Sequence, residues 1–488
     1  MAEQEWTRTQ RPEPERATEG GESAAAAADG PAREEDLSQE DWDVAVVGAG
    51  PAGSVAALAV LHTWPQARVV LLDRHDFPRD KTCGDGLAAQ ILDVLAELGE
   101  PTLLDDWPRV HRLRLGFPDG VGVARSMARP TLVVPRAELD HRLVEAAVKR
   151  GAVLRRHRVR RIRLLPSSGD AGMAGGAGTA GVAGAAGSAP GAGPRARGAG
   201  SRARAGSRAR AGSRANDVGS GGVLLDDTLR ARVVVGADGA HSTVRAALGL
   251  PTPRPGTTAI ALRGYATVHP DRAAEQVIAF AGHTAWPAYA WSFPIGDGRA
   301  NVGYGEALPV HGPGPSRARM LQRLEELLPG STDGVTGLKA YHLPLSTGRV
   351  RQPDGPVLLA GDAHGLVNPL TGEGIHAAVR SGAVAGEIAA RAARAGLPAL
   401  AGQVYRRQLG AVMGRHLRHM DLIIRLAADP RVVRGGLQVS AADQRAFDTM
   451  VDLGLADGAL TPHLVQALVR RAGAGGLIRA LRSARPGR

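Results

Sequence analysis

The chain has 488 residues, a length that allows two or three domains and a large apolar core. Its formal net charge is +12, but the arginines are scattered, and the sequence has neither zinc-finger spacing nor the aromatic pattern of an RNA-binding module, so we expect no nucleic-acid partner. The single cysteine, Cys83, cannot form an internal disulfide, and no cluster of cysteines and histidines has metal-ligand spacing. These features, with no visible signal peptide, predict a cytoplasmic protein without a metal site.

The first elements of the chain predict a βαβ unit after a disordered acidic tail over residues 1–40. The apolar segment 43–48 is typical of a buried strand, and a glycine-rich turn separates it from an expected helix over 52–63. A second apolar strand is expected over 67–73. Strand, turn, helix and strand therefore follow one another within about thirty residues, the length typical of such a unit.

The turn of this unit has the sequence Gly48-Ala-Gly50-Pro-Ala-Gly53, and Asp73 follows twenty residues after its last glycine. Glycines at this spacing permit a tight turn and let a pyrophosphate approach the helix N-terminus. An acidic side chain at the end of the second strand can accept the ribose hydroxyls of an adenosine. This context favours a dinucleotide site.

Two amphipathic helices are expected next, over 87–99 and 136–150. Strand-like segments then flank residues 166–222, which consist almost entirely of Gly, Ala, Ser and Arg and repeat the sequence GSRARA. Such a composition cannot bury enough apolar surface to order itself. We interpret it as an enlarged loop between two strands, because the entropy cost of closing a loop rises slowly with its length.

Two further strand-to-turn motifs lie later in the chain. Val233–Arg245 leads into Asp238-Gly239, and Leu358–Gly382 contains Asp362 and the turn Gly372-Glu373-Gly374-Ile375. An aspartate at such a strand end suits a sugar hydroxyl, and the amides that begin a helix carry partial positive charge. Each motif alone is equally compatible with a structural turn.

Between and after these motifs, 258–306 alternates as in an antiparallel sheet, and 402–480 is mainly helical in pattern. The expected fold is α/β: a Rossmann-type nucleotide domain interleaved with an antiparallel-sheet substrate domain, followed by a helical C-terminal region. The expected parts are the disordered tail (1–40), three FAD-binding segments (41–165, 223–250 and 351–400), the low-complexity insert (166–222), the substrate-binding sheet (251–350) and the helical region (401–488).

The three nucleotide motifs, in this order, resemble the glutathione-reductase-type FAD fold of the p-hydroxybenzoate-hydroxylase class, over about residues 43 to 410. Two more segments resemble the geranylgeranyl reductase family. One is RDKTCGDGLAAQ (Arg79–Gln90), and the other is PAYAWSFP (Pro287–Pro294), which matches the pattern P-x-Y-x-W-x-F-P at every defined position. That family reduces isolated double bonds in the polyprenyl chains of chlorophyll precursors, archaeal lipids and menaquinone.

The resemblance implies FAD as the cofactor and a hydrophobic or prenyl-lipid substrate, which leaves peripheral contact with the inner face of the cell membrane open. Tyr289, Trp291 and Phe293 would form the substrate pocket, because alternation along a strand places them on one face; plain core packing is the alternative. Cys83, Tyr289 and Trp291 are the candidate catalytic residues. The implied FAD contacts are Gly48, Gly50, Ala52, Gly53, Asp73, Cys83, Gly84, Gly86, Arg136, Asp238, Asp362, Gly374 and Ile375.

Reduction of an isolated alkene requires a proton at one carbon and a hydride from reduced flavin at the other, in a dry and electron-rich pocket. Cys83, Tyr289 and His364 are candidate acids, and a flavin-bound water is another. No second dinucleotide motif is visible, so the electron donor would be transiently bound NAD(P)H or a ferredoxin. An FAD-dependent monooxygenase of a hydrophobic or secondary-metabolite substrate is the alternative, and a non-enzymatic FAD-stabilised scaffold is a further one. The sequence leaves the substrate, the bond reduced, the oligomeric state and the role of 166–222 open.

Overall fold

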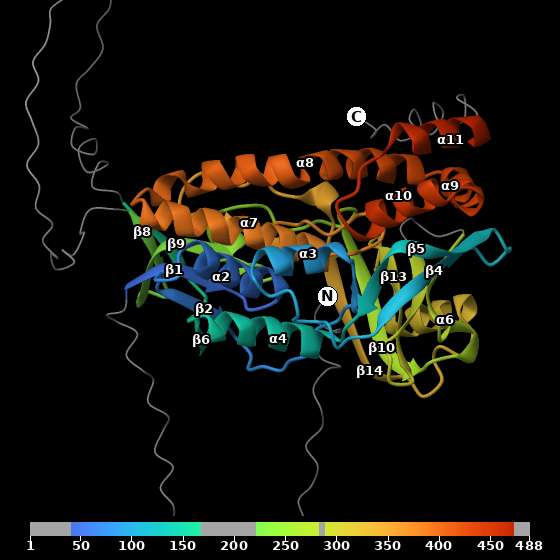
Figure 1. Ribbon diagram of the computed structural model, residues 1–488, viewed down its shortest axis with the longest axis horizontal. Coiled ribbons are helices and arrows are strands. Elements are labelled where there is room, and N and C mark those ends of the chain that lie inside the picture. The colour runs from blue at the N-terminus through green and yellow to red at the C-terminus, as the bar shows by residue number, and fades with distance from the viewer. Residues whose placement is uncertain (1–40, 167–220, 283–287, 473–488) are drawn as a thin grey trace, which may run out of the picture.

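The structure of the chain is a computed structural model that describes residues 41–166, 221–282 and 288–472. The expected disordered tail over 1–40 and nearly all of the low-complexity segment lie outside the described residues. Described residues form two sheets and a set of helices that run along both of them (Figure 1). This arrangement confirms the predicted α/β class with a helical C-terminal region.

The first sheet has the parallel core expected of a nucleotide-binding domain. Strands β6, β2, β1 and β9 run parallel in that order, β15 pairs in parallel with the end of β9, and β8 and β7 add an antiparallel edge. Alternate residues of β1 point to opposite faces of the sheet, and the two sets belong to two different apolar clusters. Both faces of the sheet are therefore buried. The strands are β1 (Asp41–Val47), β2 (Val69–Asp73), β6 (Val153–Arg156), β7 (Ile162–Leu165), β8 (Gly222–Leu225), β9 (Leu229–Gly236) and β15 (Val357–Leu359).

Helices α2 (Pro51–Thr63), α4 (Arg136–Lys149) and α7 (Ile375–Arg394) cover one face of this sheet, and α8 (Ala401–Ala427) lies over α7 (Figure 1). The backbones of helices α2 and α7 approach each other closely, because a Cβ atom at Gly382 would lie only 2.2 Å from the carbonyl oxygen of Ala52. Glycine at this position therefore allows α7 to approach the glycine-rich turn at the start of α2.

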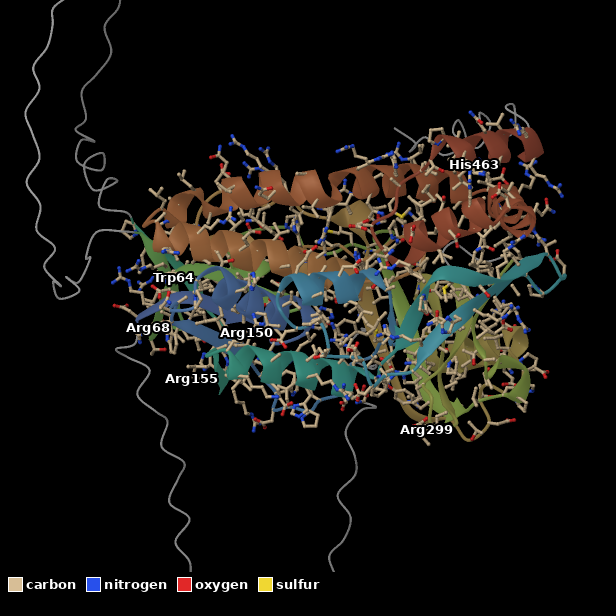
Figure 2. All side chains as sticks on the ribbon, in the orientation of Figure 1. Trp64, Arg68, Arg150, Arg155, Arg299 and His463 are labelled. Atoms are coloured by element: carbon tan, nitrogen blue, oxygen red, sulfur yellow. The ribbon has the colours of Figure 1, made fainter. Side chains whose placement is uncertain are left out.

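The outer end of the first sheet, away from the second sheet, is rich in arginine. Arg68 and Arg155 lie at this end (Figure 2). Their guanidinium carbons are 5.2 and 5.6 Å from the centroid of the Trp42 indole ring. Such stacking covers the apolar ring and keeps both charges in water.

The second sheet has eight strands in the order β14, β10, β13, β12, β11, β4, β5, β3, and all neighbours are antiparallel except β11 and β4. Three of its strands come from residues 86–133, which the sequence had placed with the FAD-binding part. The strands are β3 (Gly86–Leu87), β4 (Arg109–Gly116), β5 (Gly122–Val133), β10 (Thr258–Thr267), β11 (Glu275–Phe280), β12 (Ala288–Pro294), β13 (Arg299–Ala307) and β14 (Thr336–Pro344).

Helix α6 (Arg317–Leu327) packs on one face of the second sheet, and α9 (Pro430–Ala442) and α10 (Gln444–Leu455) pack on the other. The remaining helices are α3 (Gln90–Glu97), α5 (Thr243–Ala247) and α11 (Pro462–Ala472). Among the described helices, none is both long enough and apolar enough to cross a membrane.

Candidate active site

A cleft lies between the carboxyl ends of β1, β9 and β15 and the face of the second sheet that carries the aromatic residues of β12. It encloses about 1500 Å³, including its open mouth. Its lining comes from the first glycine motif, residues 81–88, Arg136, the turn before α5, residues 371–375, and strands β10 to β14.

At one end of the cleft, the glycine-rich turn leaves space at the N-terminus of α2. A Cβ atom at Gly50 would meet nothing nearer than the guanidinium groups of Arg79 and Arg136, at 3.6 and 3.7 Å. Gly48 and Gly53 have a different role, because a Cβ at Gly53 would lie 1.7 Å from the carbonyl oxygen of Gly48. Open space, helix amides and two guanidinium groups together fit the pyrophosphate of a dinucleotide.

The two arginines of this corner are held by one buried carboxylate. Arg136 donates two hydrogen bonds of 2.7 Å to Asp140, and Arg79 lies 3.2 Å from the same carboxylate. Burial opposes the charge of Arg136, but the carboxylate of Asp140 raises the pKa of Arg136 above its ordinary value. Arg79 also lies 3.5 Å from Asp73, so two carboxylates face the two guanidinium groups, whose remaining N–H groups can donate to a phosphate.

Asp73 ends β2 beside the same turn, as expected. Its carboxylate accepts the backbone N–H of Ala49 at 2.9 Å and that of His75 at 3.0 Å. The side chain is thereby fixed at the strand end, with lone pairs left for a ribose hydroxyl. Its role toward a ribose stays a prediction.

Asp238 is engaged within its own loop. Its carboxylate accepts hydrogen bonds from the Ser242 hydroxyl at 2.5 Å and from the backbone N–H of Thr243 at 2.6 Å, so that it caps α5. Its neighbours Ala237 and Gly239 line the cleft. A direct contact of Asp238 with the cofactor stays a prediction.

Asp362 lines the cleft and pairs with Lys81, whose ammonium lies 3.2 Å from the carboxylate and 4.8 Å from the centroid of the Tyr341 ring. Burial of Lys81 would lower its pKa, but Asp362 reverses the shift and raises it, so the ammonium is charged. Nothing in the local pattern around Lys81 pointed to this pair, because its partner is 281 residues away.

The N-terminus of α7 also faces the cleft, through Gly374 and Ile375. Glu373 precedes them and accepts the backbone N–H of His376 at 2.7 Å. Burial raises the pKa of Glu373 to about 8, so its carboxyl group holds a proton at neutral pH. Glu373 was not among the proton donors predicted from the sequence.

The opposite wall of the cleft is aromatic. Tyr289, Trp291 and Phe293 all line it, and the rings of Tyr289 and Trp291 are 6.0 Å apart between centroids. They share one face of β12, as alternation along the strand predicts. Trp291 is only 5% exposed and belongs to an apolar cluster with Leu437 and Phe447, so the same rings serve packing and lining.

The segment of Cys83 runs along the aromatic wall. Cβ atoms added at Gly84 and Gly86 would each lie 3.5 Å from the ring of Phe293. Burial, and next the negative charge of Asp85, raise the pKa of Cys83, which is therefore a neutral thiol. Thiolate chemistry is disfavoured at this position, whereas proton donation is compatible with it.

His364 is not brought together with the other candidate acids. Its Nε2 atom lies 2.9 Å from the carbonyl oxygen of Val350, and its ring packs near Tyr405 rather than in the cleft lining. Burial lowers the pKa of His364 to about 4, so it carries no proton to donate as an imidazolium at neutral pH.

Comparison with known proteins agrees with this geometry. The model of an FAD binding domain matches residues 41–163 and 205–302. Menaquinone reductase of Mycolicibacterium smegmatis is 31% identical over 366 residues, which cover 71% of this chain and 76% of that protein. Digeranylgeranylglycerophospholipid reductase 1 of Methanopyrus kandleri is 30% identical over 362 residues, which cover 72% and 81% of the two chains. The chain belongs to the geranylgeranyl reductase family.

Members and distant neighbours of this family share its fold. A geranylgeranyl bacteriochlorophyll reductase-like protein from Thermoplasma acidophilum superimposes with a TM-score of 0.65 at 18% identity, covering 91% of this chain and all of that one. An anhydrotetracycline hydroxylase from Streptomyces rimosus gives a TM-score of 0.54 at 17% identity, covering 85% of this chain and 76% of that one. With the family model and the sequence relatives above, the protein is an FAD-dependent oxidoreductase, and the predictions of its family and of FAD as its cofactor are confirmed.

Proposed function

We propose that this protein reduces isolated carbon–carbon double bonds in a polyprenyl chain, carried by a geranylgeranyl-type lipid or a menaquinone. The observation that carries this proposal is that a single cleft combines the FAD-binding motifs with an apolar wall of three aromatic rings. An extended prenyl chain offers little besides apolar surface, which such a wall can bury. The named activities of the related menaquinone and digeranylgeranylglycerophospholipid reductases support this choice.

The FAD would be held along the nucleotide face of the cleft. Gly50 and Ala52 would receive the pyrophosphate, with Arg79 and Arg136 balancing its charge, while Asp73 would bind the adenosine ribose. Bound FAD in its reduced form supplies a hydride. The other proposed contacts are Gly48, Gly53, Cys83, Gly84, Gly86, Asp238, Asp362, Gly374 and Ile375.

The residues of the chain would supply the proton. The thiol of Cys83, the phenol of Tyr289 and the carboxyl of Glu373 all line the cleft, and burial is the first cause that raises the pKa of each. Of the three, Glu373 has a pKa of about 8, near the working pH, which favours it for general acid catalysis. The Tyr289 hydroxyl already donates to the carbonyl of Thr371, which orients the ring.

The aromatic wall would also stabilise the substrate during protonation. Positive charge that develops on a protonated alkene is attracted to the faces of the Tyr289 and Trp291 rings, and the apolar lining excludes water that would capture it. We propose NAD(P)H or a ferredoxin as the electron donor, each binding transiently.

We further propose that α8 holds the protein against an anionic bilayer, which would bring the cleft to a lipid substrate. Its outer surface carries four exposed arginines for which no ion pair is found among the described residues, interleaved with exposed Val404, Val412 and Leu422. The only acid of the helix, Asp421, is paired with Arg349 at 2.8 Å. The arginines are Arg407, Arg415, Arg418 and Arg425. Cationic and apolar side chains on one exposed helix face are typical of binding at an anionic membrane surface.

Flotation with vesicles tests this surface. Vesicles rich in phosphatidylglycerol should bind the wild type, and the Arg415→Gln, Arg418→Gln variant should bind several-fold less. The matched control removes two exposed arginines of α6, Arg317→Gln and Arg319→Gln, and should bind as the wild type does. Equal binding by both variants would contradict the assignment to α8.

The chemical proposal is tested by product analysis. The purified protein is incubated without oxygen with a polyprenyl quinone and NADPH or dithionite, and the lipid is analysed by mass spectrometry. After the ring has been reoxidised to the quinone, we expect a product whose prenyl chain has gained two hydrogen atoms. A product that appears only when oxygen is admitted and contains one additional oxygen atom would support the monooxygenase alternative, which the fold shared with the hydroxylase from Streptomyces rimosus keeps open.

A further inference from the structure

A buried carboxylate, that of Asp85, belongs to the segment of Cys83 that lines the cleft. Asp85 is fully buried, and its Oδ2 atom accepts hydrogen bonds of 2.6 Å from both the Tyr265 hydroxyl and the Asn301 amide. Its other oxygen is also buried and accepts no hydrogen bond from the described residues. A buried charge is costly, so this carboxylate must be held by the groups that donate to it.

Asn301 connects this carboxylate to the aromatic wall. Its amide nitrogen donates to Asp85 and, at 2.8 Å, to the carbonyl oxygen of Cys83. Its amide oxygen accepts the indole N–H of Trp291, also at 2.8 Å. With acceptors on the nitrogen side and a donor on the oxygen side, only one orientation of the amide satisfies all three partners.

The backbone at Asp85 is also unusual. Its φ angle is +61°, in the left-handed region, which is unfavourable for most non-glycine residues but which aspartate and asparagine adopt more readily than most. This conformation directs the side chain toward Asn301 and Tyr265 while the flanking glycines line the cleft. The unfavourable backbone conformation of Asp85 therefore places its carboxylate within reach of Asn301 and Tyr265.

We propose that Asp85 is a positioning residue that acts through Asn301 to fix the indole of Trp291 and the carbonyl of Cys83 on the wall of the cleft. The importance of this wall for catalysis rests on the proposed function, in which Trp291 contacts the substrate. Asp85 does not itself exchange protons with the substrate in this account.

The charges around Asp85 support this role. Burial raises its pKa to about 6, and the hydrogen bond from Tyr265, the charge of Arg263 and the hydrogen bond from Asn301 oppose the rise. At neutral pH the group is therefore mainly a carboxylate, the stronger acceptor for both bonds. Arg263 is itself held in place by Asp80 at 2.5 Å and by the carbonyl oxygen of Cys83 at 3.3 Å.

Two substitutions at this position separate positioning from charge. Asp85→Asn tolerates the same φ angle and keeps a carbonyl oxygen that can accept both hydrogen bonds. Asp85→Gly also tolerates the φ angle but removes the acceptor. Tyr265→Phe is the matched control, because it removes the other donor to the same oxygen and leaves the bond from Asn301 in place.

The first readout is the near-ultraviolet circular dichroism of the FAD-loaded protein, with Trp291→Phe used to identify the band of this indole. We expect Asp85→Asn and Tyr265→Phe to retain the band and Asp85→Gly to lose it, with FAD content unchanged in all three. Asn301→Ala should behave as Asp85→Gly does and replaces it in the comparison if the glycine variant does not fold.

The second readout is the steady-state rate at which the protein reduces the prenyl chain of a polyprenyl quinone. Loss of one positioning hydrogen bond should raise KM about tenfold in Asp85→Gly, with Asp85→Asn restoring most of the loss. Retention of the Trp291 band and of KM in both Asp85→Gly and Asn301→Ala would overturn the proposal. Loss of turnover in Asp85→Asn with the band retained would also overturn it, because the carboxylate would then act chemically.

The two proposals fail in different ways. If the wild type reduces the prenyl chain of neither a polyprenyl quinone nor a geranylgeranyl lipid, the proposed function is wrong. The circular dichroism still decides whether Asp85 positions Trp291, because that measurement needs no substrate.

Discussion

Substitution of Gly50 should separate FAD binding from folding. The residue has φ −75° and ψ −173°, which any amino acid can adopt, and a Cβ there would be no nearer than 3.6 Å to another group. Gly50→Ala should therefore fold with little loss of stability. The methyl group would occupy the space expected for the pyrophosphate and weaken its bonds to the helix amides.

The magnitude follows from the bonds at risk. A hydrogen bond to a charged group contributes about 1.5–3 kcal/mol, so displacing the phosphate from two amides should cost about 3 kcal/mol or more. This corresponds to an FAD affinity at least about 100-fold weaker than that of the wild type. Titration of the apoprotein with FAD, followed by flavin fluorescence, measures this ratio, and thermal denaturation of the apoprotein reports folding.

Gly410→Ala is the matched control, since a Cβ at this exposed helical position meets nothing within 4 Å. It should bind FAD as the wild type does. Wild-type FAD affinity in Gly50→Ala, or in the bulkier Gly50→Val, would refute the assignment of this turn to the pyrophosphate.

Three further outcomes are expected. The rate of polyprenyl reduction should fall above about pH 8, because Glu373 then loses its proton. Glu373→Gln should lower the rate below pH 8 and remove this decline. An unchanged pH–rate profile in the variant would exclude Glu373 as the proton donor. Gly382→Val should abolish folding, because even its Cβ would lie 2.2 Å from the Ala52 carbonyl oxygen; a soluble variant with the wild-type melting temperature would contradict the close packing of α2 and α7. Deletion of residues 170–218 should leave the melting temperature, FAD content and activity unchanged, because strands β7 and β8 on either side pair with each other; a soluble, FAD-loaded but inactive variant would assign a function to the segment.

Elements specified by local sequence were predicted most accurately. The strand, turn, helix and strand around Gly50 agree with the structure within two residues, because short-range periodicity and glycine spacing determine them. The expected helix over 87–99 begins later, at Gln90, because Gly86 and Leu87 pair with β5. The strand expected at the start of the motif Leu358–Gly382 is β15, which ends at Leu359, and a single turn of 3₁₀ helix begins at Gly361.

Long-range pairing was the main feature that the sequence could not supply. Strand β4 alternates arginine with apolar residues and joins the second sheet by pairing in parallel with β11, more than 150 residues later. No local pattern specifies such a partner. For this reason, residues 86–133 were expected in the FAD-binding part, although three of their segments are strands of the second sheet.

Site residues that belong to a local motif were predicted from the sequence. Site residues whose role depends on a partner far away in the sequence were not. The aromatic residues of β12 followed from alternation and from a family pattern, whose first residue, Pro287, lies outside the described residues. Asp85 lies between two glycines of a quoted motif, but its link to Trp291 passes through Asn301, 216 residues away. Burial of Glu373, which raises its pKa, likewise follows only from the folded chain.

The central claim is that reduced FAD in this protein transfers its electrons to a prenyl double bond. Stopped-flow spectroscopy tests it directly: the protein is reduced without oxygen and mixed with a polyprenyl quinone whose ring is already in the reduced quinol form, so that only the chain can accept electrons. The account predicts reoxidation of the flavin by the wild type. Trp291→Ala should fold with FAD bound and reoxidise at least about tenfold more slowly, since burial of such a ring contributes about 2–3 kcal/mol. Wild-type flavin that stays reduced until oxygen is admitted, or a Trp291→Ala variant that reoxidises at the wild-type rate, would contradict the account.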